Sequence, residues 1–203
     1  MPSFSNQKFS PSYGGFRQAS PERRAEVIDA CTKCFLEKGL GETSVRDLSD
    51  SIHLRVAGIY SYFENKDDAV RVCAEKAAMD VEKSMLLYAV QHIQAEPKTL
   101  LSDLFGLADD NASLLRFYTQ VVTSPRYADV MAPFREKFSD RITYYITRCA
   151  EKLGVMDSEL SPMFRMGVSA YSHYMIYGRK SDIEMQVKLL TEYLENLEPA
   201  LVR

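Results

Sequence analysis

Hydroxyl-bearing and cationic side chains gather in one short segment, residues 43–66, where their chemistry suits contact with phosphates and base edges. An arginine can donate two hydrogen bonds to a guanine, and small neighbouring residues permit close approach. The segment ends in tyrosines and a lysine rather than in catalytic groups. The candidate contact residues are Ser44, Arg46, Arg55, Val56, Ala57, Gly58, Tyr60, Ser61, Tyr62 and Lys66.

A short helical pattern would position the first of these side chains. Val45, Leu48 and Ile52 fall on one apolar face at helical spacing. Ser44 is a good N-cap residue, and Asp47, three positions later, can complete a capping box with it. The spacing therefore predicts a helix that begins directly after Ser44.

A second short pattern follows a tight break at His53–Leu54. It turns Leu54, Ile59 and Phe63 inward and leaves small and hydrogen-bonding residues outside. Two short helices joined by a tight turn, the second with such an outward face, are typical of a helix-turn-helix that binds DNA.

An ordered series of residues extends this pattern on both sides, over residues 23–72. Its members are Ile28, Ala30, Cys31, Phe35, Gly39, Thr43-Ser44-Val45-Arg46-Asp47-Leu48, Ile59-Tyr60-Ser61-Tyr62-Phe63 and Lys66. This series resembles the N-terminal domain of the tetracycline-repressor (TetR) family of bacterial transcription regulators. The resemblance implies a homodimer that binds double-stranded operator DNA and responds to a small-molecule effector.

The same resemblance implies roles for individual residues. Tyr60, Tyr62 and Lys66 would hold backbone phosphates, while Arg55 would contact base edges. Ser44 and the first amides of its helix can meet a phosphate at the helix N-terminus. The alternative for Tyr60 is a place in the core of the small domain.

The turn departs from the family pattern, which usually has Ala-Gly-Val-Ser where this chain has Ile52-His53-Leu54-Arg55. His53 replaces a glycine that accepts positive φ at little cost. Arg55 replaces a serine cap, so the second helix loses a side-chain acceptor and gains a cation at the end that meets DNA. We interpret this as an altered operator preference; weakened DNA binding is the alternative.

Composition bounds the class of protein. The 203 residues carry a net charge of −3, and residues 1–76 contain 11 basic and 11 acidic side chains. Overall charge thus argues weakly against nucleic-acid binding, although only the DNA-facing side must be positive. No run approaches the roughly 20 apolar residues of a membrane helix, and residues 1–15 lack the features of a secretory signal. We therefore expect a cytoplasmic protein that does not bind membranes.

Residues 1–20 are rich in Ser, Pro and Gly and are expected to form a mobile arm. A disordered tail is one interpretation. The other is that Arg17, Arg23 and Arg24 reach a minor groove of DNA, as arms of some DNA-binding domains do.

A Cys-x-x-Cys motif at Cys31 and Cys34 raises the question of a redox or metal role. The motif lies within a helical pattern whose buried stripe also contains Val27, Ile28 and Phe35. No second cysteine pair follows at zinc-site spacing. Because buried cysteine behaves as a small hydrophobe, we expect core residues and neither metal nor cofactor.

The whole chain is expected to be all-α, without strand-like alternation. A helix from Ser20 to Gly39 precedes the helix-turn-helix, and a long helix from Lys66 to about Gln94 follows it. Further helices are expected over Thr99–Asp110, Ala112–Thr123, Arg126–Leu153, Pro162–Tyr177 and Ile183–Leu197. The expected division is an arm (1–20), a DNA-binding domain (21–66) and a ligand-binding and dimerisation domain (67–203).

The last two expected helices need a partner. Residues 162–177 are apolar around most of the helix, and residues 183–197 carry an apolar stripe. Two such helices from each of two subunits would form a four-helix interface about a two-fold axis. Burial of both helices inside a monomer is the alternative.

The middle helices are dense in aromatic residues and methionines, which suits a pocket for an aromatic or amphipathic effector. Ordinary core packing is the alternative for each residue. The candidate lining is Phe105, Phe117, Tyr118, Met131, Phe134, Phe138, Tyr145, Met166, Tyr171 and Tyr174.

Two other classes of protein remain. An enzyme is disfavoured because the three histidines are scattered and a Gly-rich phosphate loop is missing. The second is a helical ligand-binding dimer that no longer binds specific DNA. The helix that begins at Arg55 is the feature that distinguishes such a dimer from a DNA-binding regulator.

Overall fold

The computed structural model describes residues 19–92, 94–95, 97–177 and 179–196, which form nine helices and no strand. This confirms the predicted all-α class. The helices are α1 (Pro21–Lys38), α2 (Val45–Ser51), α3 (Val56–Ile59), α4 (Lys66–Gln91), α5 (Pro97–Asp110), α6 (Ala112–Thr123), α7 (Ala128–Leu153), α8 (Asp157–Tyr177) and α9 (Lys180–Glu195).

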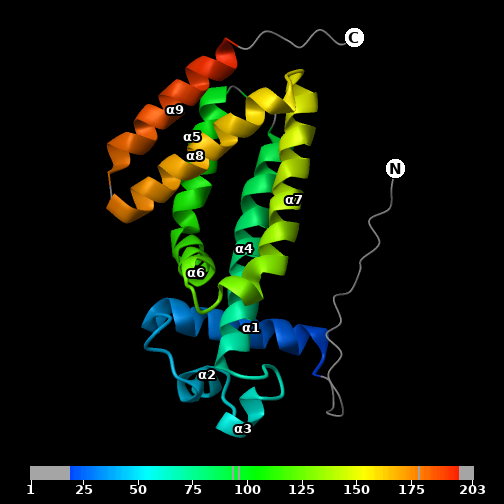
Figure 1. The fold of residues 1–203 in the computed structure, drawn as a ribbon, viewed down its shortest axis with the longest axis vertical. Coiled ribbons are helices and arrows are strands. Elements are labelled where there is room, and N and C mark those ends of the chain that lie inside the picture. Colours follow the sequence, from blue (N-terminus) through cyan, green and yellow to red (C-terminus); the bar gives the residue numbers. More distant parts are fainter. Residues whose placement is uncertain (1–18, 93, 96, 178, 197–203) are drawn as a thin grey trace.

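The helices form a small unit at one end of an elongated bundle (Figure 1). Helices α1, α2 and α3 lie at the lower end, and the long helix α4 rises from them into the bundle. There α4 packs against α5, α6 and α7, while α9 packs on α5 and α8. One unbroken helix thus connects the α1–α3 unit to the rest.

Local signals set the ends of α1 as predicted. The Ser20 hydroxyl accepts a hydrogen bond from the Arg23 amide at 3.2 Å, and Pro21 occupies the first position. At the other end Gly39 adopts φ 90°, which glycine reaches without a Cβ clash. The helix therefore begins and ends where its cap residues dictate.

The turn between α2 and α3 contains a non-glycine residue in the left-handed region, His53 with φ 55°. The sequence predicts this strain at the position where the family has glycine. Arg55 caps α3 without a side-chain hydrogen bond, also as expected. The turn thus lacks both the glycine and the serine that would make it locally stable.

Replacing His53 with glycine should therefore raise the free energy of unfolding by about 1 kcal/mol, because the left-handed conformation strains a residue with a Cβ. Urea unfolding followed by circular dichroism measures the change. His53→Ala is the control, since alanine keeps the Cβ and should give no gain. Equal stability of the glycine and alanine variants would contradict this account.

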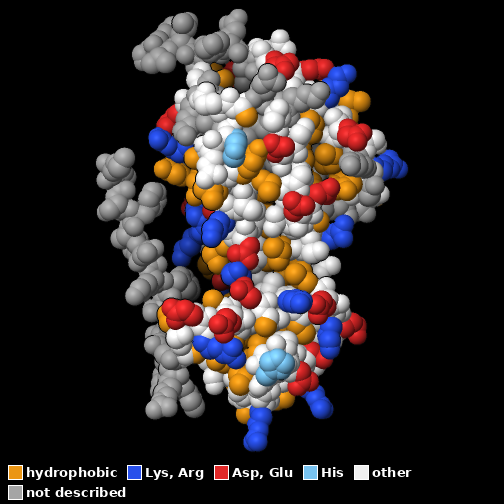
Figure 2. Space-filling model, turned by 180° about the vertical axis from the view of Figure 1, so that it is seen from behind, with side chains coloured by type: hydrophobic (Ala, Val, Ile, Leu, Met, Phe, Trp, Pro, Cys, Tyr) orange, Lys and Arg blue, Asp and Glu red, His pale blue; other side chains and the backbone are white. Residues whose placement is uncertain are grey.

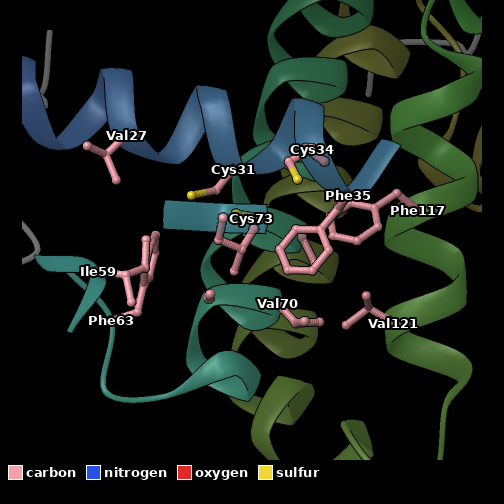
Figure 3. Close-up of a cluster of buried hydrophobic side chains, with 14 of the residues drawn as sticks. Val27, Cys31, Cys34, Phe35, Ile59, Phe63, Val70, Cys73, Phe117 and Val121 are labelled. Atoms are coloured by element: carbon pink, nitrogen blue, oxygen red, sulfur yellow. The ribbon is translucent and has the colours of Figure 1, made fainter. Parts of the chain in front are cut away.

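One hydrophobic core joins the α1–α3 unit to the bundle. It contains buried side chains of α1, α4, α6 and α7, including Phe35, Val70, Phe117 and Met131. The rings of Phe35 and Phe117 stack at a centroid distance of 5.5 Å (Figure 3). The α1–α3 unit is therefore packed on the bundle and not merely tethered to it.

The cysteines of the Cys-x-x-Cys motif belong to this core, as predicted. Cys31 and Cys34 are 0% and 6% exposed, and both are free thiols (Figure 3). Burial raises the pKa of Cys31 to about 12 and also raises the pKa of Cys34. Because the thiolate is the reactive form, both side chains are unreactive near neutral pH.

The structure corrects several helix boundaries. Helix α8 begins at Asp157 and not at Pro162, which lies inside it. The acidic residues Asp157 and Glu159 suit a helix N-terminus, and the Glu159 carboxylate accepts the Met156 amide at 3.2 Å. At its place inside α8, Pro162 has no amide hydrogen to donate to the preceding turn of the helix. Smaller differences shift the start of α5, α7 and α9 and the end of α4 by two or three residues.

None of the described helices combines the length and the apolar character that crossing a membrane requires.

Candidate nucleic-acid interface

The ten predicted DNA-contact residues all lie on α2, on α3, or on the segments around them at one end of the molecule (Figure 1). Seven have exposed side chains: Ser44, Arg46, Arg55, Val56, Ala57, Tyr60 and Ser61. Gly58, Tyr62 and Lys66 are partly buried. The apolar faces of the same segments, with Leu48, Ile59 and Phe63 at 1–3% exposure, anchor this surface to the core.

The predicted capping box at the start of α2 is present. The Ser44 amide and hydroxyl both donate to the Asp47 carboxylate, at 2.7 and 2.6 Å, and the Asp47 amide donates to the Ser44 hydroxyl at 3.2 Å. The Lys38 ammonium also binds this carboxylate. These hydrogen bonds, that of Lys38 first, hold the pKa of Asp47 well below its usual range.

Asp47→Asn should therefore destabilise the protein at neutral pH. A carboxylate with a lowered folded-state pKa adds stability above its unfolded pKa of about 3.9, and this is lost as pH falls through the folded value. The stability gap between wild type and variant should thus be complete at pH 7 and shrink below about pH 4. Thermal unfolding from pH 3 to 7 measures it, and a gap that widens toward acid would contradict the assignment.

Two tyrosines, Tyr60 and Tyr62, follow the end of α3. Tyr60 is 52% exposed, which excludes the alternative that it lies in the domain core. Tyr62 packs partly against the core. A Cβ at Gly58 would approach the Leu54 side chain to 3.2 Å, so Gly58 permits the close packing of the turn on α3. Because its side chain is largely exposed, Tyr60 is accessible to an outside partner.

Lysine and arginine side chains project from this end of the molecule, interspersed with acidic side chains (Figure 2). Arg46 lies 4.0 Å from Asp50, but its side chain is 83% exposed, so solvent weakens the pair. Arg55 is exposed at the start of α3, and Lys66 is the first residue of α4. The surface is cationic at these points rather than over its whole area.

The proposed minor-groove role of the arm is only partly within the structure, because residues 1–18, with Arg17, lie outside the described residues. Arg23 and Arg24 are described, and they serve the helix-turn-helix itself. Arg23 pairs with Glu26 at 2.9 Å and lies 3.5 Å from the Ile52 carbonyl. Arg24 donates to the Tyr62 carbonyl at 3.1 Å. Both arginines therefore have partners within the domain, and their contact with a minor groove stays a prediction.

A contact between the bundle and the start of α4 was not foreseen from the sequence. The Arg126 guanidinium donates to the Asp67 carboxylate at 2.9 and 3.2 Å, and the Tyr127 hydroxyl donates to it at 3.2 Å. A groove of about 550 Å³ beside it is bounded by residues 39–41, Lys66 and the loop before α7. Asp67 is 59 residues from Arg126, so no local pattern could indicate the pair.

The ten predicted effector-contact residues are distributed over several places. Phe117 and Met131 are 3% and 0% exposed in the core described above. Tyr118, Phe134 and Phe138 form a partly buried ring cluster of α6 and α7, with centroid distances of 6.3, 5.9 and 5.7 Å. The other five lie on α5, α7 and α8: Phe105, Tyr145, Tyr171, Tyr174 and the 53% exposed Met166.

Within the described residues no cluster of three His, Cys, Asp or Glu side chains could hold a metal ion.

Comparison with known proteins identifies the α1–α4 segment. Residues 27–71 match the model of the family described as bacterial regulatory proteins, tetR family. A curated relative, the HTH-type transcriptional repressor KstR2 of Rhodococcus jostii (strain RHA1), is 35% identical over 48 residues. That match spans 24% of each protein, so it concerns about a quarter of the relative's length.

Solved structures extend the likeness to the remaining helices. A crystal structure described as a TetR-family transcriptional regulator from Mesorhizobium loti is 18% identical, with a TM-score of 0.70 over 88% of this chain and 97% of that one. A TetR transcription regulator from Haloarcula marismortui is 16% identical, with a TM-score of 0.62 over 87% and 98%. At such identities the likeness concerns the fold alone. Residues 27–71 thus match the tetR family of bacterial regulatory proteins, and the chain as a whole has the fold of solved TetR-family regulators.

Proposed function

We propose that this regulator is a cytoplasmic, ligand-responsive repressor that binds a palindromic operator as a homodimer. The observation that carries the proposal is the exposed face of α2 and α3, with Lys66 at the start of α4 beside it, held on a buried apolar face. Residues 21–66 would bind DNA, and residues 67–203 would bind the effector and the second subunit. A dimer seated on a promoter blocks polymerase without further contacts, which favours repression.

The proposed dimer forms through α8 and α9. Their outer side chains leave large hydrophobic groups in solvent in the single chain, with exposed fractions of 36–61%. These are Phe164, Met166, Tyr177, Met185, Leu189 and Tyr193. Large exposed apolar side chains on two helices that pack together are typical of subunit interfaces. Two DNA-binding ends about 34 Å apart could then occupy successive turns of a duplex.

The proposed effector is an aromatic or amphipathic molecule. Support comes from the ring cluster of Tyr118, Phe134 and Phe138, beside which the Arg141 guanidinium lies 5.5 Å from the Phe138 ring centroid. Arg141 also binds the Glu82 carboxylate on α4 at 2.8 and 2.7 Å. Apolar walls with few polar groups suit such ligands.

The proposed release from DNA is a population shift. An effector that prefers the conformation in which the two DNA-binding ends are wrongly spaced weakens DNA binding by its differential affinity for the two states. Helix α4 would carry the displacement, because it runs without interruption from Lys66 into the bundle.

Selection of bound duplexes from a random pool tests the DNA-binding proposal. Wild type should enrich a palindrome, and Tyr60→Ala/Lys66→Ala protein should not. Failure of folded, dimeric wild type to enrich any sequence would favour the second candidate, a ligand-binding dimer without specific DNA binding. Two observations favour this candidate. His53 has a strained backbone conformation, and the cap residue of α3, Arg55, makes no side-chain hydrogen bond to the helix.

Two single variants should separate base contacts from phosphate contacts. Arg55→Ala should relax specificity at one position of each half-site, by about 1–3 kcal/mol of discrimination. Lys66→Ala should weaken binding to all sequences alike and lower the slope of log K against log salt by about 1. Binding titrations at several salt concentrations measure both, and an unchanged slope would remove Lys66 from the phosphate contacts.

A further inference from the structure

Two consecutive arginines in the first turn of α1 reach the ends of both helices of the helix-turn-helix. Arg23 lies against the carbonyl of Ile52, the C-cap of α2, 29 residues away. Arg24 donates to the carbonyl of Tyr62, beyond the end of α3 and 38 residues away. Neighbouring side chains on one helix thus contact the backbone that follows each DNA-facing helix.

The segment after α3 has few bonds of its own. Helix α3 has four residues, too few to be stable alone. The amides of Ser61, Tyr62 and Phe63 return to Gly58 and Ile59 at 3.0–3.2 Å in short turns. The buried side chains of Ile59 and Phe63 hold this segment from the inside. A further contact on the outer side would limit the directions in which Tyr60 and Tyr62 can point.

Arg24 supplies that anchor. Its 3.1 Å hydrogen bond joins a charged donor to a partly buried carbonyl, and such bonds are stronger than those between neutral groups. Arg23 contributes less, because its guanidinium is shared with Glu26 and its bond to Ile52 is long at 3.5 Å. Glu26 first and then the Tyr62 side chain raise the pKa of Arg23, so this arginine also lies near Tyr62.

We propose that Arg24 is a positioning residue for DNA binding, which holds the segment between α3 and α4 so that Tyr60 and Tyr62 face the duplex. This role rests on the proposed DNA-binding function. Without the bond, the segment samples other placements and only a fraction of molecules is competent to bind. The apparent affinity then falls in proportion to that fraction.

Arg24→Met tests the proposal, since methionine keeps an unbranched chain without a donor. Operator affinity should fall about tenfold, with the salt slope unchanged because no phosphate contact is lost. In the free protein, amide hydrogen exchange at Ser61, Tyr62 and Phe63 should accelerate by about tenfold or more, because exchange follows the ratio of open to closed segment. The matched control is Val121→Ala, which truncates a fully buried side chain on α6, on the opposite side of the core from Ile59 and Phe63 (Figure 3).

The outcomes separate this role from simpler ones. A salt slope lowered by about 1 would make Arg24 a direct phosphate contact and overturn the proposal. The same affinity loss and the same exchange pattern in Val121→Ala would show that Arg24 acts only through general stability, and would also overturn the proposal. Unchanged affinity of Arg24→Met, beside a wild type that selects DNA, would refute the role of Arg24 alone. Failure of wild type to select any duplex would refute the DNA-binding function and this role with it.

Discussion

Replacing Phe35 with alanine is expected to lower the free energy of unfolding by about 3–5 kcal/mol, the usual range for a buried phenylalanine. The side chain is 1% exposed and stacks on Phe117 of α6. The substitution therefore removes a large apolar surface and leaves a cavity between the α1–α3 unit and the bundle. Urea unfolding followed by circular dichroism measures the loss. Tyr60→Ala, at a 52% exposed position, is the control and should change stability by less than about 0.5 kcal/mol.

The same experiment tests whether the two parts unfold together. Because α1, α4, α6 and α7 share one core, wild type should give coincident transitions by circular dichroism and by tyrosine fluorescence. In Phe35→Ala the α1–α3 unit should lose its packing on the bundle, so the two transitions should separate. A wild type that already unfolds in two steps would contradict the shared core.

Replacing Leu189 with aspartate is expected to abolish the proposed dimer at micromolar concentration. Leu189 is 47% exposed in the single chain, and an unpaired carboxylate buried at this point of an interface costs several kcal/mol. A penalty of about 3 kcal/mol weakens association more than a hundredfold. Analytical ultracentrifugation measures the change in mass. Val130→Asp, at 48% exposure on α7, is the matched control and should stay dimeric.

Operator binding provides a second measurement for the same pair of variants. Leu189→Asp should lose the high affinity for a palindrome and keep weak affinity for a single half-site, because each DNA-binding end remains folded. Val130→Asp should bind the palindrome like wild type. A dimeric Leu189→Asp protein would show that α9 does not form the interface.

The sequence alone predicted what depends on neighbouring residues. The cap of α1 at Ser20 and the capping box of Ser44 and Asp47 follow from residue types within three positions of one another. The positive φ of His53 follows from the family resemblance at the turn. The buried stripe with Cys31 follows from helical periodicity in the same way. Because helices and turns are local structures, these features are encoded locally.

Tertiary packing decided which distant groups meet. The Tyr62 carbonyl lies 38 residues from Arg24, and Asp67 lies 59 residues from Arg126. Such pairs depend on how whole helices cross, which no short pattern encodes. The sequence therefore predicted the helices, with some bounds displaced, and the exposed face that we propose for DNA contact. Only the folded chain brings Arg23 and Arg24 of α1 to the backbone that follows α2 and α3, because these contacts exist only once the three helices have packed together.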